Sequence, residues 1–219
     1  MGKIVNHKGS FVVPNVFYRG EKRTYEIFEE MAPAMTQNRL VEFHENEKQK
    51  GNPYLIDCPL HFAIFLAAYN LTKQSPEIAE QLRNFIHDGI KETPSTLTRI
   101  VYNIGETDEI VHYCGTSEKY STKRDVIGRH GYINDIKDKK ALELILGVKD
   151  VGKVVNFFNW VNGTNGYFWR LEAKPKKDPD LPDYENRVVG LSFGGVGFGI
   201  NCGRSTFFKY PAFRVLRID

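Results

Sequence analysis

Apolar residues recur along this chain with two different periods, and the change of period divides it into predicted helices and strands. A spacing of three or four residues predicts a helix, whereas strict alternation predicts a strand. Two helices are predicted most clearly, one opening at Cys58-Pro59 and one at Ser75-Pro76, because proline suits the first turn, where its missing amide hydrogen is not needed. In the second helix, Ser75 is the expected N-cap and Thr93-Pro94 the expected end.

Three further segments are interpreted as helical or mixed. Arg23 to Met31 is predicted as a short helix capped by Thr24, with Ile27 and Phe28 facing inward. Another short helix is expected between Ala34 and Pro53, and Asp135 to Gly147 is predicted as a helix that stops at its glycine.

Strands are predicted where β-branched and aromatic residues alternate between turn signals. Pro14 places the first of them at a sheet edge or interrupts it. Lys174 to Asn186 is highly charged and predicts a solvated loop. The predicted strands are Ser10 to Phe17, Leu97 to Tyr102, Glu109 to Cys114, Tyr167 to Ala173, Arg187 to Leu191 and Pro211 to Ile218.

The middle of the C-terminal segment has an unusual composition. Between Leu191 and Tyr210 there is no Asp, Glu, Gln, Met or Trp, and Arg204 and Lys209 are the only charges. About five charges would be expected in a chain that is 26% charged. Aromatic residues mixed with Ser, Gly and Asn are typical of antibody paratopes. A glycine-rich hairpin packed into a core, with Gly194-Gly195 as its turn, explains the composition equally well.

Candidate catalytic chemistry is weak. No nucleophile elbow, phosphate loop, zinc-protease motif or dinucleotide fingerprint is present. The GGVGFG run at Gly194 to Gly199 lacks the helix and the Lys-Ser or Lys-Thr pair of a phosphate loop. His112 and Cys114 alternate on a predicted strand, and Asp57 precedes Cys58, but these positions are interpreted as structural.

Charge, cysteine spacing and hydropathy exclude several classes of protein. A net charge of +3 and a pI of 8.6 do not favour nucleic-acid binding. Three widely spaced cysteines predict buried free thiols, with no metal site and no cofactor. No signal peptide is predicted, and the longest apolar run, Pro59 to Leu71, is too short to span a membrane. These features are compatible with a cytoplasmic or virion-associated protein.

Four short motifs in the C-terminal part carry a family resemblance. They are FWRL at Phe168 to Leu171, RVVGL at Arg187 to Leu191, INC at Ile200 to Cys202 and PAFRVLR at Pro211 to Arg217. Together they resemble the C-terminal half of the C-type-lectin fold and, more closely, the variable proteins of diversity-generating retroelements, particularly those of archaea and archaeal viruses. The resemblance implies an α+β, C-type-lectin-like fold over residues 1–219, with helices N-terminal and antiparallel strands C-terminal.

In that family an error-prone reverse transcriptase diversifies Asn codons to almost any residue except Lys, Glu, Gln, Met and Trp, and only Lys209 departs from this bias between Leu191 and Tyr210. The resemblance implies a non-enzymatic protein that binds a protein or cell-surface ligand through a variable region at 187–218, without calcium-dependent sugar binding. The expected outward-facing binding residues are Ser192, Phe193, Gly195, Val196, Phe198, Asn201, Arg204, Ser205, Phe207, Phe208 and Tyr210.

Two alternatives remain from other classes of function. The first is an enzyme resembling the formylglycine-generating family, whose members also end on a strand like AFRVLR and need a reactive cysteine, for which Cys202 is the one candidate in the right region. The second is a structural or assembly protein, such as a viral one, that uses the aromatic segment as an oligomer interface.

Overall fold

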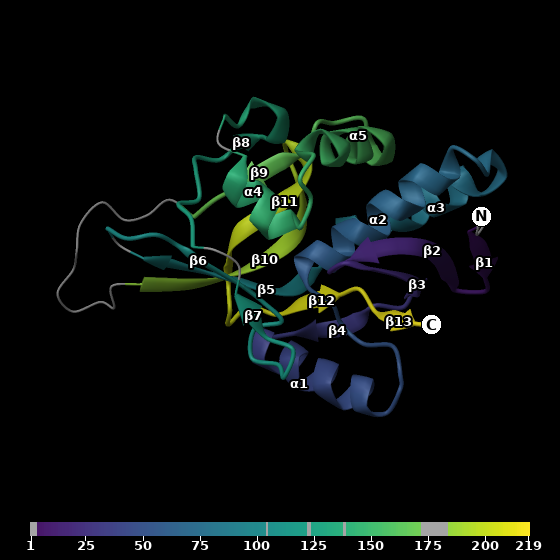
Figure 1. Cartoon of the computed structure of the whole chain (residues 1–219), viewed down its shortest axis with the longest axis horizontal. Coiled ribbons are helices and arrows are strands. Elements are labelled where there is room, and N and C mark those ends of the chain that lie inside the picture. Colours follow the sequence, from purple (N-terminus) through teal and green to yellow (C-terminus); the bar gives the residue numbers. More distant parts are fainter. Residues whose placement is uncertain (1–3, 104, 122–123, 138, 172–183) are drawn as a thin grey trace.

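The structure is a computed structural model that describes residues 4–103, 105–121, 124–137, 139–171 and 184–219. Within these residues, helices and antiparallel strands are interleaved, which confirms the α+β class (Figure 1). The chain begins with four strands, so the expectation that helices occupy the N-terminal part is wrong.

A four-stranded sheet joins the two ends of the chain. Its strands are β1 (Val5–His7), β2 (Ser10–Tyr18), β3 (Glu21–Phe28) and β13 (Val215–Arg217), in the order β1-β2-β3-β13. The labelled N and C ends therefore lie on the same side of the molecule (Figure 1). Pro14 lies where the β2–β3 register shifts, between Val13 and Val16, so β2 continues through the proline by means of a bulge.

The helix predicted from Arg23 to Met31 is wrong, because these residues form most of β3. Tyr25 and Ile27 are buried and alternate with more exposed neighbours, as in a strand with one covered face. Ile27 pairs with Phe11 of β2 on one side and with Val215 of β13 on the other. Pairing with both ends of the chain thus overrides the local helix signals.

Three helices follow the short strand β4 (Ala32–Met35), which pairs with β12 (Tyr210–Ala212). They are α1 (Gln37–Gln49), α2 (Cys58–Thr72) and α3 (Pro76–Lys91), so both clearly predicted helices are confirmed and the helix expected between Ala34 and Pro53 is α1. Asp57 caps α2 by accepting a hydrogen bond from the Leu60 amide, at 2.8 Å. The Ser75 side chain makes no capping hydrogen bond, contrary to expectation.

The larger sheet has seven strands in the order β7-β6-β5-β10-β11-β9-β8. Its β9–β11 pair is parallel, and its other pairs are antiparallel. The members are β5 (Ser95–Asn103), β6 (Glu109–His112), β7 (Tyr120–Ser121), β8 (Gly131–Tyr132), β9 (Tyr167–Trp169), β10 (Tyr184–Gly194) and β11 (Gly197–Ser205).

The remaining helices are the 3₁₀ helix η1 (Ile133–Asp135), α4 (Lys140–Leu146) and α5 (Val151–Asn162). The apolar run at Val154 to Trp160 belongs to α5, while the predicted helix at Asp135 to Gly147 is shortened to α4. Of the predicted solvated loop, residues 174–183 lie outside the described residues and Tyr184 to Asn186 begin β10. The predicted strand at Tyr167 ends at Trp169, and residues 172–173 are not described.

Phenylalanines from distant segments fill the core between the helices. Phe65 of α2 stacks on Phe157 of α5 at a centroid distance of 5.3 Å, and Phe213 meets Phe65 edge-on at 5.6 Å. Phe213 lies so close to α3 that a Cβ added at Gly89 would be 2.4 Å from its ring. The C-terminal segment is therefore fixed against the helices immediately after the residues expected to bind a ligand.

Candidate functional site in the C-terminal hairpin

The segment with unusual composition forms the β10–β11 hairpin. Phe193 pairs with Phe198, and Gly194 with Gly197, so the turn residues are Gly195 and Val196, one position later than predicted. The GGVGFG run thus forms an antiparallel ladder and its turn. It does not wrap a helix N-terminus in the manner of a phosphate loop.

Apolar side chains are exposed at the turn of this hairpin. Phe193 is 47% exposed and Val196 is 41% exposed. Gly195 is exposed and Ser192 is half-buried. We call Ser192, Phe193, Gly195 and Val196 the tip surface.

A second group of exposed apolar side chains follows the C-terminal end of β11. Phe207 is 84% exposed and Phe208 is 66% exposed, in the short connection to β12. The Phe207 amide donates to Ser205 Oγ at 3.3 Å, which helps to shape the connection. We call Ser205, Phe207, Phe208 and Tyr210 the turn surface.

The predicted binding residues do not form one patch. The tip and turn surfaces lie at opposite ends of the nine-residue strand β11, which at about 3.3 Å per residue separates them by roughly 26 Å. Asn201 lies between them, half-buried, and its Oδ1 accepts a hydrogen bond from the Gly203 amide at 2.9 Å. A compact small molecule could therefore contact only one of the two surfaces.

Phe198 is a core residue, which corrects the expectation that it faces outward. Its exposed fraction is 0%. The ring packs against His87 of α3 at 5.1 Å and against Phe193 at 5.3 Å. Because alternation identifies two faces without showing which one is covered, only the position of α3 decides that Phe198 is inside.

Arg204 is also a core residue, with an exposed fraction of 4%. Its Nη1 donates to the carbonyl oxygens of Thr93, at 2.7 Å, and Pro94, at 3.1 Å, and its Nη2 donates to the carbonyl of Leu191. The guanidinium carbon lies 4.6 Å from the centre of the Tyr210 ring. Burial lowers the pKa of Arg204 to about 10, so the side chain remains charged at neutral pH. Arg204 therefore links the hairpin to the α3–β5 connection by hydrogen bonds and packs against Tyr210 of the turn surface.

Two glycines of the hairpin are required by close packing. A Cβ at Gly190 would lie 2.4 Å from Arg204 Nη1, and a Cβ at Gly199 would lie 2.1 Å from the Tyr167 carbonyl oxygen. Gly190 also follows a register shift after Val188 on β10. Part of the glycine content interpreted as typical of a paratope thus serves the scaffold.

The three cysteines are free and buried, as predicted. Burial raises the pKa of Cys202, and a buried thiol with a raised pKa is a poor nucleophile. His112 Nδ1 lies 3.0 Å from Thr98 Oγ1, whereas Cys114 Sγ accepts a hydrogen bond from Gln37. The two residues thus have separate partners, in agreement with their structural interpretation.

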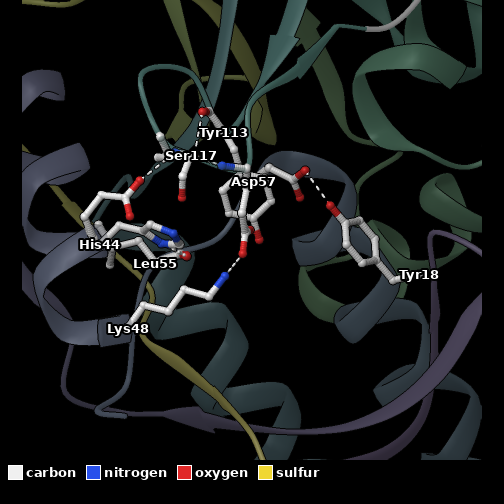
Figure 2. A network of polar contacts seen from close by, with 10 residues as sticks. Tyr18, His44, Lys48, Leu55, Asp57, Tyr113 and Ser117 are labelled. Carbon is white, nitrogen blue, oxygen red and sulfur yellow. Dashed lines mark hydrogen bonds and ion pairs between the residues drawn. The ribbon is translucent and has the colours of Figure 1, made fainter. Parts of the chain in front are cut away.

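Sequence reasoning missed a polar network around Asp57. Its Oδ2 accepts hydrogen bonds from the hydroxyls of Tyr18, at 2.7 Å, and Tyr120, at 2.8 Å, while Oδ1 caps α2. Figure 2 shows the Tyr18 hydroxyl directed at this carboxylate. Asp57 is fully buried, and burial raises its pKa to about 6. The sequence analysis interpreted Asp57 as structural without assigning it as the cap of α2, and no local signal indicated the tyrosines.

Among the described residues, no group of three or more His, Cys, Asp or Glu side chains is arranged to hold a metal ion. None of the helices in the described part of the chain combines the length and apolar character that crossing a bilayer requires. No protein-family model matches the chain, and no curated protein or solved structure is significantly similar to it.

Proposed function

We propose that this chain is a non-enzymatic recognition protein that binds a protein or cell-surface ligand through the turn surface, with the tip surface as a second contact for large ligands. The observation that carries the proposal is the exposure of Phe207 and Phe208, 84% and 66%, on an anchored connection. Adjacent exposed aromatic side chains are typical of interaction surfaces.

The backbone beneath the turn surface is held before any ligand arrives. Arg204 binds three carbonyl oxygens on one side, and β12 pairs with β4 on the other. A fixed backbone reduces the conformational entropy lost on binding. Burying one phenylalanine side chain contributes about 1.5–3 kcal/mol, so two such side chains could dominate the binding energy.

A C-type-lectin-like fold and retroelement diversification are parts of this proposal, and the motifs and amino-acid composition of the C-terminal segment support them. The exposure pattern makes them testable position by position. If the segment is diversified, codons for Phe193, Val196, Phe207 and Phe208 should align with adenine-containing codons in a neighbouring near-repeat. Codons for residues that the scaffold requires should match the repeat: Phe198, Arg204, Gly190 and Gly199.

Sequencing the source locus checks this expectation. A near-repeat beside a reverse transcriptase gene, differing mainly at codons for exposed residues, would support diversification. Differences spread equally over buried and exposed codons, or no repeat at all, would contradict it.

Replacing both turn phenylalanines should remove binding without unfolding the protein. We expect Phe207→Ser combined with Phe208→Ser to weaken binding of labelled protein to cells of the source organism at least tenfold, since two apolar contacts are lost. The free energy of unfolding should change by less than about 1 kcal/mol, because both rings are exposed. Cell-binding titrations and urea denaturation measure the two effects.

Phe17→Ser is the matched control, because Phe17 is 63% exposed on β2, outside both surfaces. It should leave binding unchanged. Equal loss of binding in both variants would contradict the proposal, as would binding that survives in the double variant. An oligomer of the wild-type chain that the double variant converts to a monomer would favour the assembly function instead.

A further inference from the structure

A concave region lies between the β2–β3 turn, the C-terminal end of α1, residues 113–119 and β13. It is an open pocket of about 960 Å³. Figure 2 labels Lys48 and Tyr113, two of the residues that line it. None of the eleven residues expected to bind a ligand lines it.

The lining of this pocket is strongly cationic. Its charged residues are Arg19, Arg23, Lys48, Lys119 and Arg217, against Glu21 and Glu118. Both glutamates are already paired, Glu21 with Arg23 and Glu118 with Lys48. Arg19 is already engaged, because its guanidinium carbon lies 4.3 Å from the centre of the Tyr120 ring and its charge acts on the Asp57 carboxyl. Among the described lining residues, Lys119 and Arg217 form no ion pair with a glutamate, so two positive charges remain for a ligand. The whole chain carries a net charge of only +3, which makes this local excess notable.

Tyrosines form the floor and part of the wall. Tyr25 and Tyr113 are 5% and 3% exposed, and Tyr18 and Tyr54 stand beside them. Burial raises the pKa of Tyr25 to about 12, and the charge of Arg217 opposes that rise, which indicates that the guanidinium lies near this phenol. Phenol rings thus lie in the same pocket as Lys119 and Arg217, while the Tyr18 hydroxyl is already used as a donor to Asp57.

The backbone at the pocket is held in an uncommon conformation. Tyr113 has a φ of +50°, although it is bulky and buried, and Arg19 has a φ of +49°. Arg19 lies in a hairpin turn that uses this conformation, whereas Tyr113 follows β6 directly. Positive φ in a bulky residue is costly and is concentrated at ligand sites.

We propose that this pocket binds a small phosphomonoester attached to a flat aromatic body, such as an aryl or nucleoside monophosphate. Arg217 and Lys119 would hold the phosphate, since guanidinium and ammonium groups make strong charge-assisted hydrogen bonds to it. The tyrosine rings would contact the aromatic body. Asp57 does not contact this ligand, because it is fully buried and both its oxygens accept hydrogen bonds from protein groups.

Isothermal titration with phenyl phosphate and adenosine monophosphate tests the proposal, with inorganic phosphate and phenol as partial ligands. At least one of the two organic phosphates should bind more tightly than either partial ligand. Arg217→Gln and Lys119→Gln should each weaken that binding about fivefold, and the double variant about twentyfold. Lys153→Gln, an exposed change on α5, is the matched control and should have no effect.

Three results would overturn the proposal. The first is that neither organic phosphate binds at about 10 mM, a concentration well above the dissociation constants expected for such sites. The second is equal binding of inorganic and organic phosphate, and the third is unchanged binding in the double variant. Both substituted side chains are exposed, so the variants should fold, which their thermal unfolding verifies. None of these measurements involves the turn surface, so failure here leaves the proposed recognition function untouched.

Discussion

Arg204→Ala should lower the free energy of unfolding by about 3–5 kcal/mol, the range typical of removing one member of a buried charged network. The substitution deprives the carbonyl oxygens of Thr93, Pro94 and Leu191 of their guanidinium donors. Arg204 is 4% exposed, so water cannot simply replace these hydrogen bonds. Equilibrium unfolding in urea measures the loss.

Arg187→Ala is the matched control on the same hairpin. Arg187 pairs with Glu185, whose side chain is 42% exposed, so the expected loss is below about 1 kcal/mol. Arg204→Lys should lower the free energy of unfolding about as much as Arg204→Ala does. The single nitrogen of a lysine ammonium group cannot reach the three carbonyl oxygens that the spread guanidinium nitrogens contact. A loss below about 1 kcal/mol for Arg204→Ala would show that the hairpin is not fastened by this residue.

The second large effect is a loss of stability in mild acid. Burial lowers the pKa of both His61 and His112 from 6.5 to about 4. His61 Nε2 is buried without a hydrogen-bond partner, so protonation of His61 places an unpaired N–H in the core. For the pKa of His112, burial outweighs the opposing effect of a hydrogen bond with the Leu144 backbone. The unfolded chain binds these two protons below pH 6.5, and the folded chain does so only near pH 4. Stability is therefore present above pH 6.5 and is lost as the pH falls from 6.5 to 4.

Asp57 opposes part of this loss. Its pKa is raised from 3.8 to about 6, so the folded state takes up a proton between pH 6 and 3.8 and gains stability there. At 1.36 kcal/mol per pH unit, each histidine contributes a loss of about 3 kcal/mol and Asp57 a gain of about 3 kcal/mol. We therefore expect the free energy of unfolding to fall by about 3 kcal/mol in total between pH 7 and pH 4.5. Urea denaturation at both pH values measures this change.

Substitution separates the two contributions. His61→Gln should reduce the acid-dependent loss by about 2–3 kcal/mol, whereas His7→Gln should not change it, because the His7 side chain is 54% exposed. Asp57→Asn should enlarge the loss, since the opposing carboxylate is gone. Stability that rises on acidification of the wild-type protein would contradict the assignment of neutral buried histidines.

Local sequence signals were sufficient for part of this architecture. Proline and apolar spacing located α2 and α3, and alternation with turn residues located β5, β6 and the glycine-rich hairpin. These elements are determined within a few residues of chain. Phe207 and Phe208 are exposed, as the family resemblance led us to expect.

The candidate site was predicted only in part, because exposure depends on what covers each face. Phe193 and Phe198 are paired and similar in type, yet α3 covers one and leaves the other 47% exposed. Arg204 has the sequence appearance of a surface charge and becomes a scaffold residue because Thr93 and Pro94 present carbonyls to it. No neighbouring residue in the sequence specifies either outcome.

The sequence by itself determined the α+β class, the two clearly predicted helices, the glycine-rich hairpin and an exposed aromatic segment. Tertiary structure alone decided that residues 23–28 form a strand, that the residues expected to bind a ligand separate into two surfaces, and that Asp57 meets Tyr18 and Tyr120. The physical reason is distance along the chain: helix caps and turns depend on adjacent residues, whereas strand pairing, burial and polar networks join segments that only folding brings together.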